Sequence, residues 1–136
     1  MNDSSLEKYR HDLAIVRETA AQVMKDFGVL GLEIRFSGDP FSAYEELKEQ
    51  IAPVLFELFQ NDRSRFQSLL YRIDLSESTF RKLLGEQPHS DFSYNLADMI
   101  LQREFQKVLT RRFFFEIIIF LQTISRVLNR YKQICF

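Results

Sequence analysis

Apolar residues recur at alternating steps of three and four from residue 6 to residue 27, as they do on one face of an α-helix. The positions of this first seam are Leu6, Tyr9, Leu13, Val16, Ala20, Val23 and Phe27. Ser4 and Glu7 have the spacing of a capping box, and Gly28 can end a helix in the left-handed conformation. The pattern therefore predicts a first helix that extends from Ser4 to Gly28.

The pattern changes in the next thirty residues. Residues 32–36 alternate apolar and polar side chains between two glycines, which predicts one short strand. An ordered loop explains this alternation nearly as well, because a lone strand has no partner. Asp39 and Pro40 predict the start of a second helix, and Pro53 inside it predicts a kink. The buried stripe of this helix comprises Tyr44, Leu47, Ile51, Val54, Leu55 and Leu58.

Two shorter helices are predicted next. Asn61 and Asp62 indicate the end of the second helix and the cap of a third, whose apolar positions are Phe66, Leu69, Leu70 and Ile73. The fourth has apolar residues at Phe80, Leu83 and Leu84 and ends at Gly85. Its cap is either Asp74, with Glu77 completing a capping box, or Ser76. We expect Asp74 to be this cap.

A long helical pattern begins near Phe92 and meets no glycine or proline up to residue 136. Its first stripe comprises Leu96, Ile100, Leu101, Phe105 and Val108. A second seam then appears, on a rotated face, at Phe114, Ile117, Leu121, Ile124, Leu128, Tyr131 and Cys135. Either the helix breaks near residues 111–113, or one long helix changes partners there. Residues 113–120 are rich in β-formers, but the continuing heptad spacing favours helix.

Together these elements predict an all-α protein, a compact bundle of five or six helices in a single domain over residues 1–136. The first and last seams each cover three heptads, so we expect residues 113–136 to pack along the first helix. Two alternatives remain open. Residues 113–135 could form a homodimer interface, or they could lie on a membrane surface with flanking cations at Arg111, Arg112, Arg126 and Arg130.

Composition narrows the class of protein. The chain is 46% apolar and 27% charged, which is typical of a globular protein. The single Cys135 excludes a disulfide within the chain and favours a reducing, cytoplasmic location. The longest nearly apolar run, residues 113–121, is too short to span a bilayer. We expect no transmembrane segment.

Candidate catalytic chemistry is sparse. None of the four glycines lies in a phosphate-binding loop. Glu7, His11 and Glu18 could share one helix face, but exposed polar residues of this kind usually only solvate a helix. We therefore expect no enzymatic activity, no metal and no cofactor.

The charges are divided unevenly. Residues 1–61 carry 6 Lys and Arg against 11 Asp and Glu, whereas residues 62–136 carry 12 against 8. Arg103, Lys107 and Arg111 form a basic row four residues apart, and Arg112 adds to it. The row could pair with the acidic first or second helix, contact a protein partner, or bind phosphates of nucleic acid or another anionic surface.

Arg72 and Asp74 flank Ile73 in an apolar neighbourhood and are a further candidate contact. We expect Arg72 to form an ion pair with Glu104 or Asp98, and a binding site is the alternative.

A resemblance covers about residues 47–112. The residues that carry it read Leu70-Tyr71-Arg72-Ile73-Asp74-x-Ser76-Glu77, then Leu96-Ala97-x3-Leu101-x-Arg103-Glu104-x-Gln106-Lys107-x3-Arg111. This pattern resembles a small family of uncharacterised bacterial proteins, which implies a helical fold and no activity that could be transferred. The family pattern ends near Arg111, so the segment from Phe113 departs from it.

From these observations we expect a non-enzymatic cytoplasmic scaffold or protein–protein interaction module. Its partner would be an unknown protein or a second copy. The alternative is binding of nucleic acid or an anionic surface through the basic row, and nucleic acid is the less favoured of these because the net charge is −1.

Overall fold

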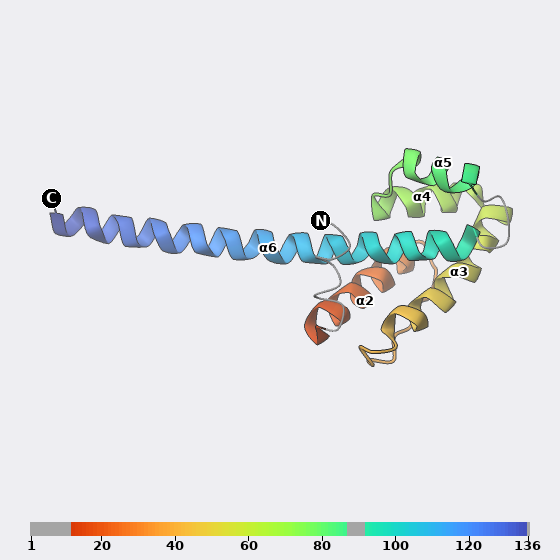
Figure 1. Ribbon diagram of the computed structural model, residues 1–136, viewed down its shortest axis with the longest axis horizontal. Coiled ribbons are helices and arrows are strands. Elements are labelled where there is room, and N and C mark those ends of the chain that lie inside the picture. Colours follow the sequence, from red (N-terminus) through yellow and green to blue (C-terminus); the bar gives the residue numbers. More distant parts are fainter. Residues whose placement is uncertain (1–11, 87–91, 136) are drawn as a thin grey trace.

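The computed structural model describes residues 12–86 and 92–135, and their fold is all-α (Figure 1). The described helices are α2 (Leu13–Gly28), α3 (Ala43–Asn61), α4 (Arg63–Ile73), α5 (Glu77–Glu86) and α6 (Phe92–Cys135). No strand occurs among the described residues. The all-α class is therefore confirmed. The shape is not a compact bundle throughout, because the second half of α6 projects away from the other helices (Figure 1).

The first described helix, α2, begins at Leu13, inside the range predicted for one helix. Asp12 is in extended conformation and caps α2, since its Oδ1 accepts hydrogen bonds from the amides of Ala14 and Ile15 at 3.1 and 3.2 Å. One continuous helix from Ser4 is therefore wrong. The predicted capping box of Ser4 and Glu7 lies outside the described residues.

Residues 32–36 are an ordered loop, and the predicted strand is wrong. The backbone groups here bond to side chains of α3 instead of to a second strand. Gln50 Oε1 accepts from the Arg35 amide at 2.9 Å, and Gln50 Nε2 donates to the Arg35 carbonyl at 2.7 Å. Glu46 Oε1 accepts from the Ser37 amide at 2.6 Å. The alternation of apolar and polar residues still places Ile34 in the core, although this segment is not paired with a second strand among the described residues.

The second predicted helix also begins later than expected. Asp39 closes a turn, accepting from the Phe41 amide at 3.0 Å and from the Ser42 hydroxyl at 3.0 Å, and α3 starts after Ser42. The helix continues through Pro53 as one element. Asp62 caps α4 as predicted, because its Oδ1 accepts from the Arg65 amide at 3.1 Å.

The main core lies where α2, α3 and α4 surround the first half of α6 (Figure 1). Its residues from α6 are Phe92, Leu96, Ala97, Ile100 and Leu101. Four phenylalanines, Phe59, Phe66, Phe80 and Phe92, join α3, α4, α5 and α6, with ring centroids 5.1–6.5 Å apart. A smaller cluster of Ile15, Val108 and Leu109 packs the start of α2 against the middle of α6.

Helix α6 has no break near residues 111–113 and is one element of 44 residues. Helices α2–α5 and residues 92–112 of α6 form the folded part of the molecule, which we call the head. Residues 113–135 form what we call the tail. Phe113 still packs against the small cluster with Ile15, near the start of α2, whereas Phe114, Phe115 and Ile117 are each more than half exposed. Within the described residues the tail seam therefore does not pack along α2, and the rest of the predicted first helix lies outside them.

Candidate functional site

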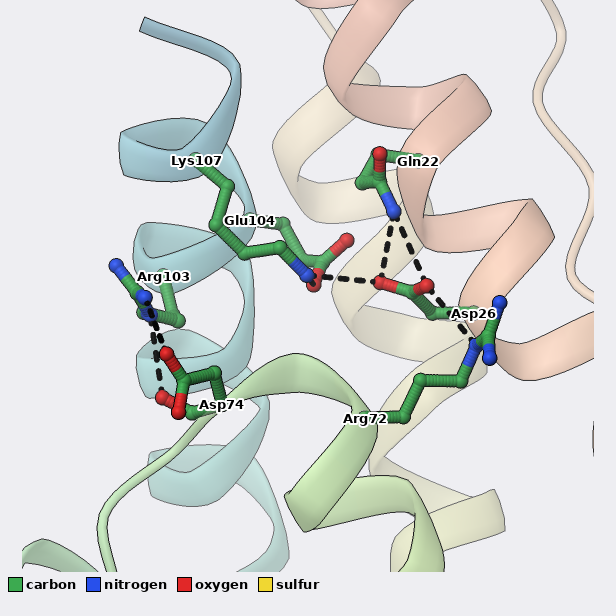
Figure 2. A network of polar contacts seen from close by, with 7 residues as sticks. All are labelled: Gln22, Asp26, Arg72, Asp74, Arg103, Glu104 and Lys107. Atoms are coloured by element: carbon green, nitrogen blue, oxygen red, sulfur yellow. Dashed lines mark hydrogen bonds and ion pairs between the residues drawn. The ribbon is translucent and has the colours of Figure 1, made fainter. Parts of the chain in front are cut away.

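A buried polar network joins three helices of the head (Figure 2). Asp26 of α2 lies at its centre. Its carboxylate accepts from Gln22 Nε2 at 3.0 Å and pairs with Arg72 Nε of α4 at 3.2 Å and with Lys107 Nζ of α6 at 3.2 Å. Lys107 Nζ also pairs with Glu104 Oε1 at 3.0 Å. Two cations from two helices thus meet two buried carboxylates.

Helical spacing explains why both carboxylates are buried. Glu104 follows Ile100 by four residues and precedes Val108 by four, so it shares their buried face and is fully inaccessible. Asp26 follows Val23 by three residues and is 2% exposed. Lys107 lies one turn beyond Glu104 and reaches both carboxylates from the edge of the head.

The two carboxyl groups have opposite pKa shifts. The pKa of Glu104 is raised to about 7, first by burial and then by neighbouring Asp26, although Lys107 lowers it in part. Burial also acts to raise the pKa of Asp26, but its contacts with Glu104, Gln22 and Lys107 outweigh burial and hold the pKa below its ordinary value. Glu104 Oε2 has no hydrogen-bond partner among the described residues, which fits a carboxyl group that keeps its proton.

This network is suited to holding helices together. Every charged group in it faces another member, and Asp26 and Glu104 are closed off from solvent. A shallow hollow of about 250 Å³ lies elsewhere on the head, lined by Met24, Gly28, Gly31, Leu32, Glu33 and Ile34. No network residue lines it. The geometry supports a structural role for these charges.

The basic row is divided among internal partners. Lys107 pairs with Asp26 of α2, and Arg112 pairs with Glu18 of α2 at 2.7 Å, so pairing with the acidic first helix is confirmed for these two. Arg103 pairs instead with Asp74, at 3.0 Å. Arg111 is exposed and forms no ion pair within the part of the chain that the structure describes.

Arg72 does not contact the partners expected for it. It pairs with Asp26, because α4 packs beside the end of α2. Asp98 is occupied by Lys48 Nζ at 3.0 Å and by the hydroxyl of Tyr44, both from α3. Glu104 is occupied by Lys107. The ion pair of Arg72 is confirmed in kind, but both named partners were wrong.

Asp74 is not the cap that begins the fourth helix. It ends α4 in the left-handed conformation, with φ 64°, and its carboxylate pairs with Arg103 (Figure 2). Ser76 caps α5, since its Oγ accepts from the Thr79 amide at 3.2 Å. The alternative cap was therefore the right one, and the Asp74 prediction failed because aspartate suits both helix ends.

The tail is the second candidate site, and it is a surface. Ten of its large apolar side chains are 38–65% exposed, namely Phe114, Phe115, Ile117, Ile119, Phe120, Leu121, Ile124, Val127, Leu128 and Tyr131. Single exposed apolar residues are common, but a contiguous set of this size marks an interaction surface. Of the Glu7–His11–Glu18 group considered for a metal, Glu18 pairs with Arg112, and the other two residues lie outside the described residues.

Comparisons with family models, with curated protein sequences and with solved structures find no match to this chain. The resemblance over residues 47–112 therefore stays a hypothesis. Among the described residues, no helix combines the length and the apolar character that crossing a bilayer requires.

Proposed function

We propose that this chain is a non-enzymatic protein-interaction module, in which the head is a folded base and the tail is the surface that binds protein. The observation that carries the proposal is the exposure of ten large apolar side chains over five helical turns of the tail. Covering apolar area contributes about 25 cal/mol per Å². A helix of this composition is stabilised in water chiefly by packing, which the head does not supply beyond Phe113.

The alternative function, binding of nucleic acid or an anionic surface through the basic row, has less support. Three of the four cations in that region, Arg103, Lys107 and Arg112, form ion pairs with carboxylates of the head. A phosphate would have to compete with those carboxylates for the same donors. Arg111 alone does not make a basic surface.

A photoreactive amino acid at position 121 tests the proposal, because Leu121 lies on the apolar seam and is 58% exposed. The matched control carries the same group at position 122, where Gln122 is exposed beside the seam. Irradiation in cells should give a protein adduct at position 121, identified by mass spectrometry, and much less at position 122. Lipid adducts without protein adducts at position 121 would contradict a protein-binding role.

A further inference from the structure

We propose that the partner of the tail is the tail of a second copy of this chain, packed against it in antiparallel orientation. This inference rests on the proposed function, because it names the protein that the tail binds. Four features carry it: the area of the apolar surface, the rows that flank the seam, the point at which the head blocks the seam, and the distribution of charge.

The exposed apolar area of the tail matches what a dimer needs. Ten large side chains of about 150–250 Å² each, half exposed, leave roughly 1,000 Å² of apolar surface per chain. Burying about two thirds of that on both copies would remove roughly 1,300 Å² from water, within the range of about 1,200–2,000 Å² for stable protein interfaces. The seam runs over three heptads, about 33 Å at about 1.5 Å per residue, which is long enough for two helices to pair.

The rows beside the seam determine the orientation. Heptad notation places the seam at positions a and d, with Phe114, Leu121 and Leu128 at a. Position g is then apolar along the tail, at Phe113, Phe120 and Val127. Position e becomes polar toward the C-terminus, from Ile118 to Ser125 and Lys132. This difference between the two flanking rows is the feature on which orientation depends.

In a parallel pair, position g faces position e of the partner. Phe120 would then meet the partner's Ser125, and Val127 would meet the partner's Lys132. In an antiparallel pair, g faces g, so Phe120 meets the partner's Val127 and both apolar side chains are covered. The apolar g row therefore favours the antiparallel arrangement.

The head limits how far a second helix can follow the seam. If the heptad spacing is extended toward the N-terminus from Phe114, the preceding a and d positions are Thr110, Lys107 and Arg103. Arg103 is paired there with Asp74, which lies at the end of α4 (Figure 2). A parallel partner would bring its own head to this level, and the two heads would compete for one space.

An antiparallel partner avoids this conflict. Its seam pairs Phe114 with the partner's Tyr131, Ile117 with the partner's Leu128, and Leu121 with the partner's Ile124. Position 135 of the partner then lies level with position 110, so the partner's seam covers the exposed seam of this tail and stops short of Lys107 and Arg103, which pair with the head.

Charge distribution agrees with this orientation. Arg126, Arg130 and Lys132 are exposed and lie in the last ten described residues, whereas Glu116 lies near the start of the tail. A parallel pair would set the three cations of each copy level with the same three cations of the other. The antiparallel pair separates the two cationic ends and brings each toward the end that carries the partner's Glu116. One like-charge approach remains, between Arg111 and the partner's Lys132, at the exposed edge.

Mixed single-cysteine variants test the inference on the full chain. Cys135→Ser removes the native thiol, and either Ile117→Cys or Leu128→Cys is added. The two proteins are mixed in equal amounts, allowed to exchange, and treated with a short bis-maleimide. In the antiparallel pair, position 117 faces position 128 of the other copy, so the mixture should become crosslinked in up to about half of its chains. Each variant alone should stay near background, because like positions are about 16 Å apart along the axis.

Three results would overturn the inference. Strong crosslinking of Leu128→Cys with itself would show a parallel pair. A monomeric mass for the wild-type chain by light scattering at 100 μM, with no crosslinking, would show that a second copy is not the partner. Sedimentation with anionic vesicles in place of self-association would show a lipid surface. If the second copy fails while position 121 still gives an adduct with a different protein, the proposed function stands and only this inference is lost.

Discussion

Replacing Glu104 with glutamine should make the protein more stable at pH 8 and change its stability much less at pH 5. The pKa of Glu104 is raised from its ordinary value of 4.5 to about 7. Between these two values the folded protein keeps a proton that the unfolded chain has released. The free energy of unfolding therefore falls as the pH rises through that window, and no penalty exists below it.

The magnitude follows from the size of the shift. A pKa raised from 4.5 to about 7 costs about 3 kcal/mol above pH 7, at 1.36 kcal/mol per pKa unit, and about 2.5 kcal/mol of this develops between pH 5 and pH 8. Glutamine carries no proton to lose. Its carbonyl can accept from Lys107, and its amide is uncharged, as the protonated carboxyl is. The Asp26 carboxyl, whose pKa is lowered, is ionised at both pH values and does not change the comparison.

The assay is urea unfolding followed by far-UV circular dichroism, at one protein concentration, for the wild-type chain and Glu104→Gln at pH 5 and pH 8. The difference in unfolding free energy between the two chains should grow by about 2.5 kcal/mol across that range. Glu116→Gln, at an exposed position of α6, removes the same charge and is the matched control. Growth of less than about 1 kcal/mol, or equal growth in the control, would refute the argument that Glu104 is buried and protonated.

Three further predictions concern Asp74, Asp62 and the removal of the tail. Asp74→Ala should cost about 1 kcal/mol, because alanine is strained at φ 64°, whereas Asp74→Gly should cost less; equal losses in thermal unfolding would contradict the left-handed assignment. Asp62→Ala should cost about 1 kcal/mol and Asp62→Ser should recover most of it, as measured by urea unfolding, since Asp62 caps α4. A chain that ends after Glu116 should stay folded and become monomeric by light scattering, because Leu109 is the last fully buried residue among the side chains that the structure describes; aggregation of this shortened chain would show that the tail supports the head.

Local patterns predicted the elements whose stabilising contacts are themselves local. The stripes of α3 and α4, the Asp62 cap and the start of α6 near Phe92 depend on spacing within one helix, and the structure contains them. Residues 32–36 are a segment whose structure the local pattern could not decide. Alternation fits both a strand and a loop that lies against a helix, and the choice depended on Gln50 and Glu46 of α3.

The buried network was only partly predictable. Glu104 lies four residues from both Ile100 and Val108, so its position in the apolar stripe is a signal of burial that the sequence contains. The pairing of Arg72 with Asp26 depends on how α4 is rotated against α2, and no spacing in the sequence specifies that rotation. The tail seam was visible in the sequence, whereas its exposure depends on where α2 begins and ends.

The continuity of α6 has a geometric consequence for anything bound to the tail. An unbroken helix turns 100° and advances about 1.5 Å with each residue. The number of residues between Leu109 and the seam therefore determines the side of the head on which a partner bound to the tail lies. One inserted residue would swing the partner to a different side of the head, whereas seven would move it about 10 Å outward with nearly the same facing. Only insertions close to a whole number of turns, of about 7, 11 or 18 residues, would keep the partner on the same side of the head.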